Sequence, residues 1–387
     1  MPDRATAINA HVLRWARERA GLSLEDVAAR LKKAVEDVAA WESGTEAPTY
    51  RQLEELAAHL YKRPIAIFFF PAPPEEDDPA GRFRTLPQTE LAVLAPDTLF
   101  AIREALALQE SVRELSIGES RPTRLITRDI HPMTILSIPE LASAVRSYLS
   151  VSLGQQSSWR TTEEAFKRWR QVLEASGICV FKRSFKQAEI LGLSIFDDDL
   201  PAILVNNSTA HSRQVFTLFH ELAHLLYSTG GITKNDSSFI EHLTGDARDT
   251  EIRCNEFAAE FLVPMTSFPW QEFRAADLDA FVSTQARRYN VSREVILRRL
   301  LDRGLVGQRL YSQKTTKWNQ EYEKARQEKG GGGNYYATQA SYFGEMFLRM
   351  AFNQYYRGTV TLEELAGHLR MKARNVSRLE EFMLAGE

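Results

Sequence analysis

The sequence predicts an α+β protein that is mostly helical. Apolar residues in 8–63 recur with the spacing of short amphipathic helices, whereas three apolar runs between 178 and 206 are short enough to be strands. Helical patterns surround these runs and return after them. We therefore expect an all-helical N-terminal bundle, a central part with a small sheet, and a helical C-terminal region.

Length and composition restrict the class of protein. The chain has 387 residues, which is enough for two or three domains, and its 44% hydrophobic and 26% charged residues are ordinary for a soluble globular protein. No run approaches the ~18 apolar residues of a membrane span, and the N-terminus lacks an apolar signal core. The two cysteines are too few for a disulfide scaffold. We expect a cytoplasmic protein with no membrane partner.

The first part of the chain, residues 1–70, is expected to form short helices. Ser23 is placed as an N-cap before an acidic first turn, Gly44 ends a helix near 34–42, and Thr49 restarts the chain after Pro48. Two segments resemble the XRE-type helix-turn-helix of phage repressors: Arg-x-x-Ala-Gly-Leu-Ser-Leu-Glu-Asp-Val-Ala at 17–28 and Trp-Glu-Ser-Gly-Thr-Glu-Ala-Pro-Thr at 41–49. The resemblance implies that the helix near 34–42 enters the major groove of DNA.

The charge of this part argues for weak DNA binding. Residues 1–70 contain ten basic and ten acidic side chains, and the reading helix itself carries Glu36, Asp37 and Glu42. Because phosphate neutralisation drives affinity, binding by such a domain should fall steeply with salt. The alternative is a repressor-like fold reused for docking or dimerisation. The candidate phosphate contacts are Arg30, Lys32, Lys33 and Arg51.

A connector is expected between the N-terminal bundle and the sheet. Residues 71–79 combine four prolines with four acidic residues, which is typical of a stiff acidic linker. Residues 90–150 then have helical patterns. We assign 71–155 to the acidic linker and a helical connector.

The most specific chemical signal is the run His220-Glu221-Leu222-Ala223-His224. Two histidines four residues apart lie on the same face of a helix, where both imidazoles can hold one Zn²⁺ while Glu221 acts as general base. A buried strand at 202–206 precedes the run, and an apolar helix over 216–227 contains it. The pattern predicts a hydrolytic zinc site.

A catalytic zinc ion needs a third protein ligand. Residues 251–264 read as a second helix that ends at Pro264 and offers Glu251, Glu256 and Glu260. Glu251 is the candidate we favour, and Asn255 lies four residues further on the same face, so that one of the two could bind the metal while the other orients a neighbour. Periodicity alone leaves all three glutamates open.

The order and spacing of these motifs resemble the ImmA/IrrE family of metallopeptidases. The matching pieces are the strand that ends at Asn206, Phe-Thr-Leu-Phe-His-Glu-Leu-Ala-His at 216–224, and Glu-x-x-x-Asn-x-Phe-Ala-Ala-x-x-Leu-Val-Pro at 251–264. The resemblance covers about residues 156–310 and implies a zincin-like peptidase domain. It also implies Zn²⁺ ligands His220, His224 and Glu251 and catalytic Glu221.

One position departs from the family pattern. Cys254 stands where the family has a small apolar residue. Since it lies three residues beyond Glu251, it is on roughly the same helix face. It is either buried filler or a redox-sensitive group beside a metal ligand.

The C-terminal part is basic. Residues 282–329 contain twelve Lys and Arg against five Asp and Glu, a formal net charge of about +7. Residues 361–378, with four basic side chains, resemble a further helix-turn-helix unit. Both segments can hold nucleic acid; the alternative is helices that brace the peptidase and have a solvated basic face. We assign 311–387 to a helical C-terminal region.

The leading hypothesis is a zinc-dependent endopeptidase in bacterial or phage-type gene regulation. By resemblance, its protein substrate is a helix-turn-helix repressor or antitoxin that is cut under stress. The alternative is a DNA-binding regulator or antitoxin whose peptidase fold senses a ligand or serves as a scaffold. The expected partners are the protein substrate, DNA bound through the helix-turn-helix or the basic C-terminal helices, and a second copy of the chain.

Overall fold

The computed structural model describes residues 3–75, 94–118, 124–132, 137–185, 187, 189–229, 231–234, 243–328 and 333–385. The chain divides into two compact units, one comprising Met1–Arg82 and Pro87–Glu104, the other Phe83–Leu86 and Ala105–Glu387. Of the expected acidic linker, residues 76–79 lie outside the described part. Among the described residues, no helix combines the length and apolar character needed to cross a membrane.

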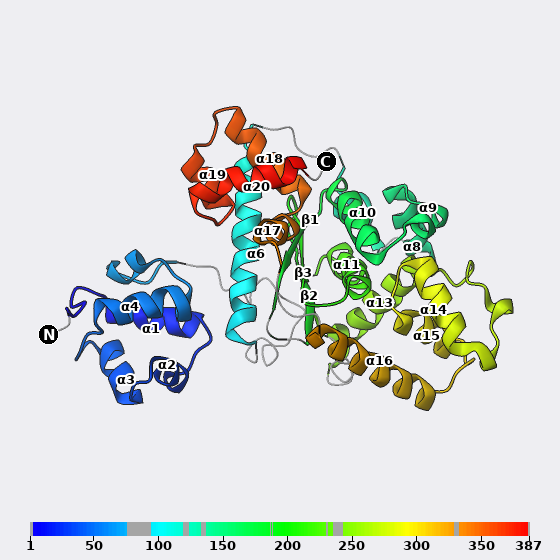
Figure 1. Ribbon diagram of the computed structural model, residues 1–387, viewed down its shortest axis with the longest axis horizontal. Coiled ribbons are helices and arrows are strands. Elements are labelled where there is room, and N and C mark those ends of the chain that lie inside the picture. Colours follow the sequence, from blue (N-terminus) through cyan, green and yellow to red (C-terminus); the bar gives the residue numbers. More distant parts are fainter. Residues whose placement is uncertain are drawn as a thin grey trace. The chain divides into compact units, whose positions relative to one another are not determined.

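The first unit contains the expected bundle of short helices (Figure 1). Ser23 caps the second helix through Asp26, and Gly44 ends the third with a φ of 76°. Its core is formed by apolar side chains of all four helices, including Val12, Val27 and Leu53. The helical segments are α1 (Ala10–Arg19), α2 (Leu24–Leu31), α3 (Val35–Ser43), α4 (Tyr50–Glu55), the π-helical η1 (Leu56–Tyr61) and the 3-10 helix η2 (Ile65–Phe69).

The second unit is built on a four-stranded sheet with the order β1-β3-β2-β4. The strands are β1 (Cys179–Arg183), β2 (Ile190–Ile195), β3 (Ala202–Asn206) and β4 (Gly231–Lys234). β1 runs parallel to β3, whereas β2 runs antiparallel to β3 and β4. The first three strands were predicted from their apolar runs, and β4 was not.

Helices cover both faces of this sheet, which explains why β1 to β3 are continuous buried runs. Adjacent side chains of a strand point to opposite faces. Val180 belongs to the core that includes α11 (His211–Leu226), while the ring of Phe181 lies 5.8 Å from that of Phe347 on α18 (Glu345–Tyr356). The sheet therefore forms the middle layer of the second unit.

The main core of this unit lies on the α11 side of the sheet. α11 packs against β2 and β3, and α13 (Gly245–Leu262) packs against α11 (Figure 1). Three aromatic rings join α10 (Thr162–Glu174) to both: Trp169 lies 4.8 Å from Phe219 and 5.3 Å from Phe261, measured between centroids. Because nearly all of α11 from Gln214 to Leu226 is buried, the polar residues in that part of the helix contact protein rather than solvent.

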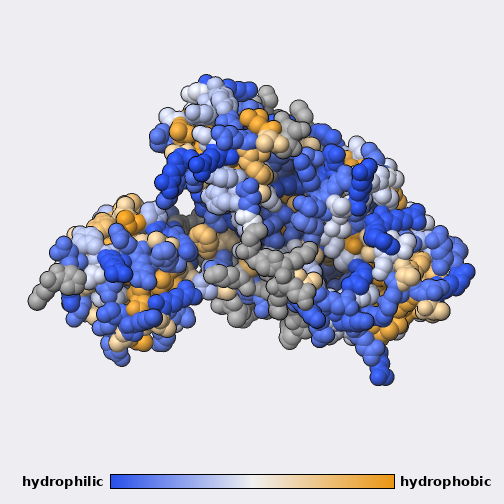
Figure 2. Space-filling model, viewed as in Figure 1, coloured by the Kyte–Doolittle hydropathy of each residue, from blue (hydrophilic) through white to orange (hydrophobic). Residues whose placement is uncertain are grey.

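α17 (Tyr335–Phe343) contacts β1, and the Arg170 guanidinium of α10 donates to the carbonyls of Val180 on β1 and Ser341 on α17. The first residues of α6, up to Glu104, belong to the first unit. The remaining helical segments among the described residues are α6 (Pro96–Leu115), α7 (Ile126–Asp129), α8 (Ile138–Leu149), α9 (Leu153–Ser158), α14 (Leu278–Tyr289), α15 (Arg293–Asp302), α16 (Gln308–Glu328), α19 (Leu362–His368), α20 (Val376–Ala385), and the 3-10 turns η5 (Trp270–Glu272), η6 (Ala275–Asp277) and η7 (Ala373–Asn375). Among the described residues on the face shown in Figure 2, hydrophilic ones predominate. The predicted class, α+β and mostly helical, is confirmed.

Candidate metal centre

The start of α11 is held by the end of the preceding strand. Asn206, fully buried at the end of β3, accepts hydrogen bonds from Phe185 N and Ser208 N and donates to Ile190 O. These bonds connect the end of β3 to the segment that follows β1 and to the first residue of β2. They fix the turn from which α11 begins, and thus the position of the histidines nine and thirteen residues into the helix.

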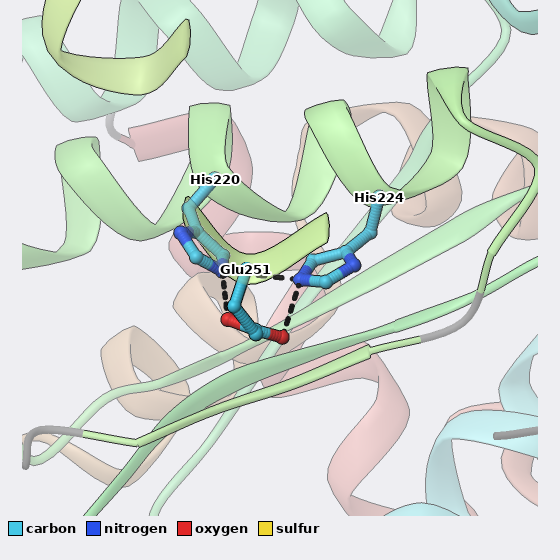
Figure 3. A group of neighbouring side chains, drawn as sticks. All are labelled: His220, His224 and Glu251. Carbon is cyan, nitrogen blue, oxygen red and sulfur yellow. Dashed lines mark hydrogen bonds and ion pairs between the residues drawn. The ribbon is translucent and has the colours of Figure 1, made fainter. Parts of the chain in front are cut away.

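His220, His224 and Glu251 come together at the centre of the core (Figure 3). His220 Nε2 lies 3.3 Å from Glu251 Oε2, His224 Nε2 lies 3.1 Å from Glu251 Oε1, and the two Nε2 atoms are 3.1 Å apart. Two nitrogens bound at ~2.0–2.1 Å to a tetrahedral zinc ion are about 3.3 Å apart. The spacing and the types of donor therefore fit Zn²⁺.

Each imidazole is oriented by a contact at Nδ1, the ring nitrogen that points away from the centre of the cluster. His220 Nδ1 lies 3.2 Å from Asn255 Oδ1, and His224 Nδ1 lies 3.3 Å from Thr229 Oγ1, whose hydroxyl donates to the carbonyl of His224. In both pairs the oxygen acts as acceptor, so each Nδ1 carries the proton. Both Nε2 lone pairs then point at the centre of the cluster, which is the tautomer a metal ligand requires.

The charges of the cluster also suit a cation. Burial opposes ionisation of Glu251, but the interactions with His224 and His220 outweigh it and hold the pKa of this carboxyl well below its usual range. Burial opposes protonation of His224, yet Cys254 and Glu251 raise its pKa overall. Glu251 therefore stays ionised in the core, and a metal ion bound there would replace the proton that His224 otherwise holds beside this carboxylate.

The other two glutamates of α13 point elsewhere. Glu256 is exposed. Glu260 is buried, but its carboxylate accepts hydrogen bonds from Arg299 Nη2 at 2.9 Å and from Met265 N at 3.1 Å. Of the three candidates left open by periodicity, only Glu251 faces the histidines.

Glu221 lies between the two histidines and is fully buried. Strand β2 passes close to it at Gly192, where an added Cβ would lie 3.5 Å from Glu221 Oε1 and 2.5 Å from the Thr217 methyl. Gly192 therefore allows the sheet to approach the motif. Sequence reasoning missed Gly192 and Thr229; a glycine inside an apolar strand run was the available signal for the former.

Cys254 is fully buried and interacts with His224, and burial raises the pKa of its thiol. Cys179 is also buried, and both thiols are free. Cys254 thus lies beside a histidine of the cluster, and the interpretation of this thiol as filler or as a redox-sensitive group stays open.

The four candidate phosphate contacts belong to the first unit and not to this cluster. Lys32 and Lys33 follow α2, Arg30 lies in its last turn, Arg51 lies in the first turn of α4, and all four are exposed. The expectation that Glu42 adds negative charge to the reading face was wrong. Glu42 is buried, and its carboxylate accepts hydrogen bonds from Arg17 Nε at 2.7 Å and Nη2 at 2.9 Å. The exposed acidity of α3 is therefore limited to its first turn.

Comparison with known families agrees with both parts of the chain. Residues 173–301 match the model of the IrrE N-terminal-like domain, a peptidase family, and residues 10–61 match a helix-turn-helix domain. No curated protein matches the chain. The first match contains the whole His220, His224 and Glu251 cluster, and the second contains α1 to η1. The chain therefore combines an IrrE N-terminal-like peptidase-family domain with an N-terminal helix-turn-helix domain.

Proposed function

We propose that this protein is a zinc-dependent endopeptidase that acts in gene regulation. One observation carries the proposal: a buried His, His and Glu cluster, with Glu221 between its histidines, lies within a domain that matches a peptidase family. Bound at His220, His224 and Glu251, Zn²⁺ would supply Lewis acidity toward a peptide carbonyl and toward water.

The chain's own residues have distinct roles in this proposal. Glu221 takes a proton from the attacking water and delivers it to the leaving amine. Asn255 and Thr229 hold the imidazoles in the Nδ1-protonated form. The buried surroundings keep competing water away from these groups and strengthen their electrostatic interactions.

We further propose that the substrate is a helix-turn-helix repressor or antitoxin, whose cleavage under stress switches genes on. The helix-turn-helix match at residues 10–61 supports a link to transcription. The two free, buried cysteines agree with a location in the cytoplasm.

Replacement of Glu221 by glutamine tests the catalytic assignment. The amide keeps the size of the side chain but cannot accept the proton, so Glu221→Gln should abolish cleavage while zinc binding persists. The measurements are zinc content by mass spectrometry and cleavage of helix-turn-helix repressors encoded in the same genome. Glu256→Gln, an exposed change on α13, is the matched control and should cleave normally. Cleavage by Glu221→Gln at the wild-type rate would refute the proposal.

A second candidate is a DNA-binding regulator whose peptidase fold serves as a sensor or scaffold. The burial of Glu42 favours this second candidate, because the surface of the reading helix is less acidic than its sequence suggests. A binding assay over a salt series decides between the two. A steep salt slope with preference for one promoter, in a protein that cleaves nothing, would favour the regulator.

A further inference from the structure

A cavity of about 540 Å³ lies in the second unit between the start of α11 and helices α14, α15 and α16. This volume is within the ~300–1,000 Å³ range of small-molecule sites. Three arginines line it, Arg213, Arg287 and Arg293, against a single carboxylate, Glu294. The wall is therefore positively charged and suits an anion.

The arginines are not all neutralised by neighbours. Arg213 donates to Asn319 at 2.9 Å and is 3.9 Å from Glu294, and Arg293 donates to Glu321 at 3.1 Å. Arg287 is exposed and has no hydrogen-bond or ion-pair partner within the described part of the chain. A ligand with two or more negative oxygens could pair with the guanidinium of Arg287. The guanidinium groups of Arg213 and Arg293, which already have partners, lie in the same wall.

Backbone and hydroxyl donors add to this charge. The cavity is lined by Thr162, the first residue of α10, by Ala210, the N-cap of α11, and by Ser292, the N-cap of α15. Each helix carries partial positive charge at this end, and α11 has no side-chain cap there. α10 and α15 are capped by Thr161 and Ser292 and carry acidic residues in their first turns, so the uncapped start of α11 is the helix end that adds positive charge to the arginine-lined cavity.

An aromatic wall faces these donors. Trp318 and Tyr322 of α16 line the cavity, and the guanidinium carbon of Arg293 is 4.6 Å from the centroid of the Trp318 ring. Aromatic rings beside arginines provide stacking surfaces for a flat group.

We propose that this cavity binds a small phosphate-bearing molecule of nucleotide size. A phosphate carries about −1.5 to −2 charges and three acceptor oxygens, which match the guanidinium groups and the start of α11. Trp318 and Tyr322 would contact the flat part of the same ligand. The proposal does not depend on peptidase activity, because none of its residues belongs to the metal cluster.

Calorimetric titration of the full chain with ADP and with pyrophosphate, at constant ionic strength, tests the proposal. We expect both probes to bind the wild type. Arg287→Gln should weaken both by at least about tenfold, which corresponds to one lost charge-assisted contact. Arg288→Gln is the matched control, because Arg288 is the exposed neighbour that does not line the cavity.

Trp318→Leu separates the two parts of the ligand. It should weaken ADP and leave pyrophosphate unchanged. Since phosphates also bind zinc ions, the contrast between Arg287→Gln and Arg288→Gln decides the location of the site. The proposal is overturned if neither probe binds, if the two arginine variants behave alike, or if Trp318→Leu changes neither probe.

Discussion

Replacing Lys182 by methionine should stabilise the second unit at neutral pH. Lys182 lies on β1, is only 2% exposed, and has its ammonium 4.5 Å from the centroid of the Phe166 ring. Burial, with a smaller contribution from Arg170, lowers its pKa from 10.5 to about 7. The fold therefore penalises the charged form of a side chain that is charged in the unfolded protein.

The sign of the pH dependence follows from proton binding. Between about pH 7 and pH 10.5 the unfolded chain holds more protons at this position than the folded chain, so stability rises with pH in that window. The gap between the two pKa values is equivalent to about 5 kcal/mol, since one pKa unit is worth about 1.4 kcal/mol. Relaxation of the Lys182 side chain toward water reduces this energy. We therefore expect Lys182→Met to raise the free energy of unfolding by about 2 kcal/mol near pH 7.

Urea unfolding read by pulsed hydrogen exchange in peptides of β1 measures this effect. Lys182→Met should be more stable than the wild type near pH 7, and the difference should shrink by about a third or more near pH 9.5. Lys372→Met, at an exposed lysine, is the control and should change stability at neither pH. A Lys182→Met advantage that is the same at both pH values would show that desolvation of the charge is not its cause.

Three further changes test other parts of the structure. Asn255→Ala removes the acceptor behind His220 and should weaken zinc binding about 10- to 100-fold, measured by competition with a chelator; unchanged affinity would contradict the tautomer argument. Gly192→Ala places a methyl 2.5 Å from the Thr217 side chain and should lower the free energy of unfolding by about 1–3 kcal/mol. Arg17→Leu leaves the Glu42 carboxylate buried without its partner and should cost the first unit about 3–5 kcal/mol in urea unfolding, most of which a second change, Glu42→Leu, should restore.

The parts of the fold that the sequence predicted are those with a local signal. The spacing of His220 and His224 follows from the helix repeat alone, and Ser23 and Gly44 mark helix ends by their own backbone and side-chain chemistry. The apolar runs of β1 to β3 were visible because both faces of the sheet are covered. In contrast, Gly231–Lys234 is a four-residue strand whose assignment depends on pairing with β2.

The choice among the glutamates of α13 was not local. Which face of α13 meets α11 depends on packing between elements distant in the sequence, and family resemblance supplied the preference for Glu251 where periodicity could not. Glu42 was misjudged for the same reason, because the partner that draws it inward, Arg17, lies 25 residues earlier on another helix. Charge counts along the chain do not reveal such pairs.

The cover of β1 has a consequence for biosynthesis. Phe181 packs against Phe347, and the carbonyls held by Arg170 include that of Ser341, so α17 and α18 cover a face that begins with β1, much earlier in the sequence. During translation, the side of β1 that carries Phe181 remains uncovered by these helices until α18 has left the ribosome. The sheet that supports the His220, His224 and Glu251 cluster would thus be fully covered only after α17 and α18 have been synthesised.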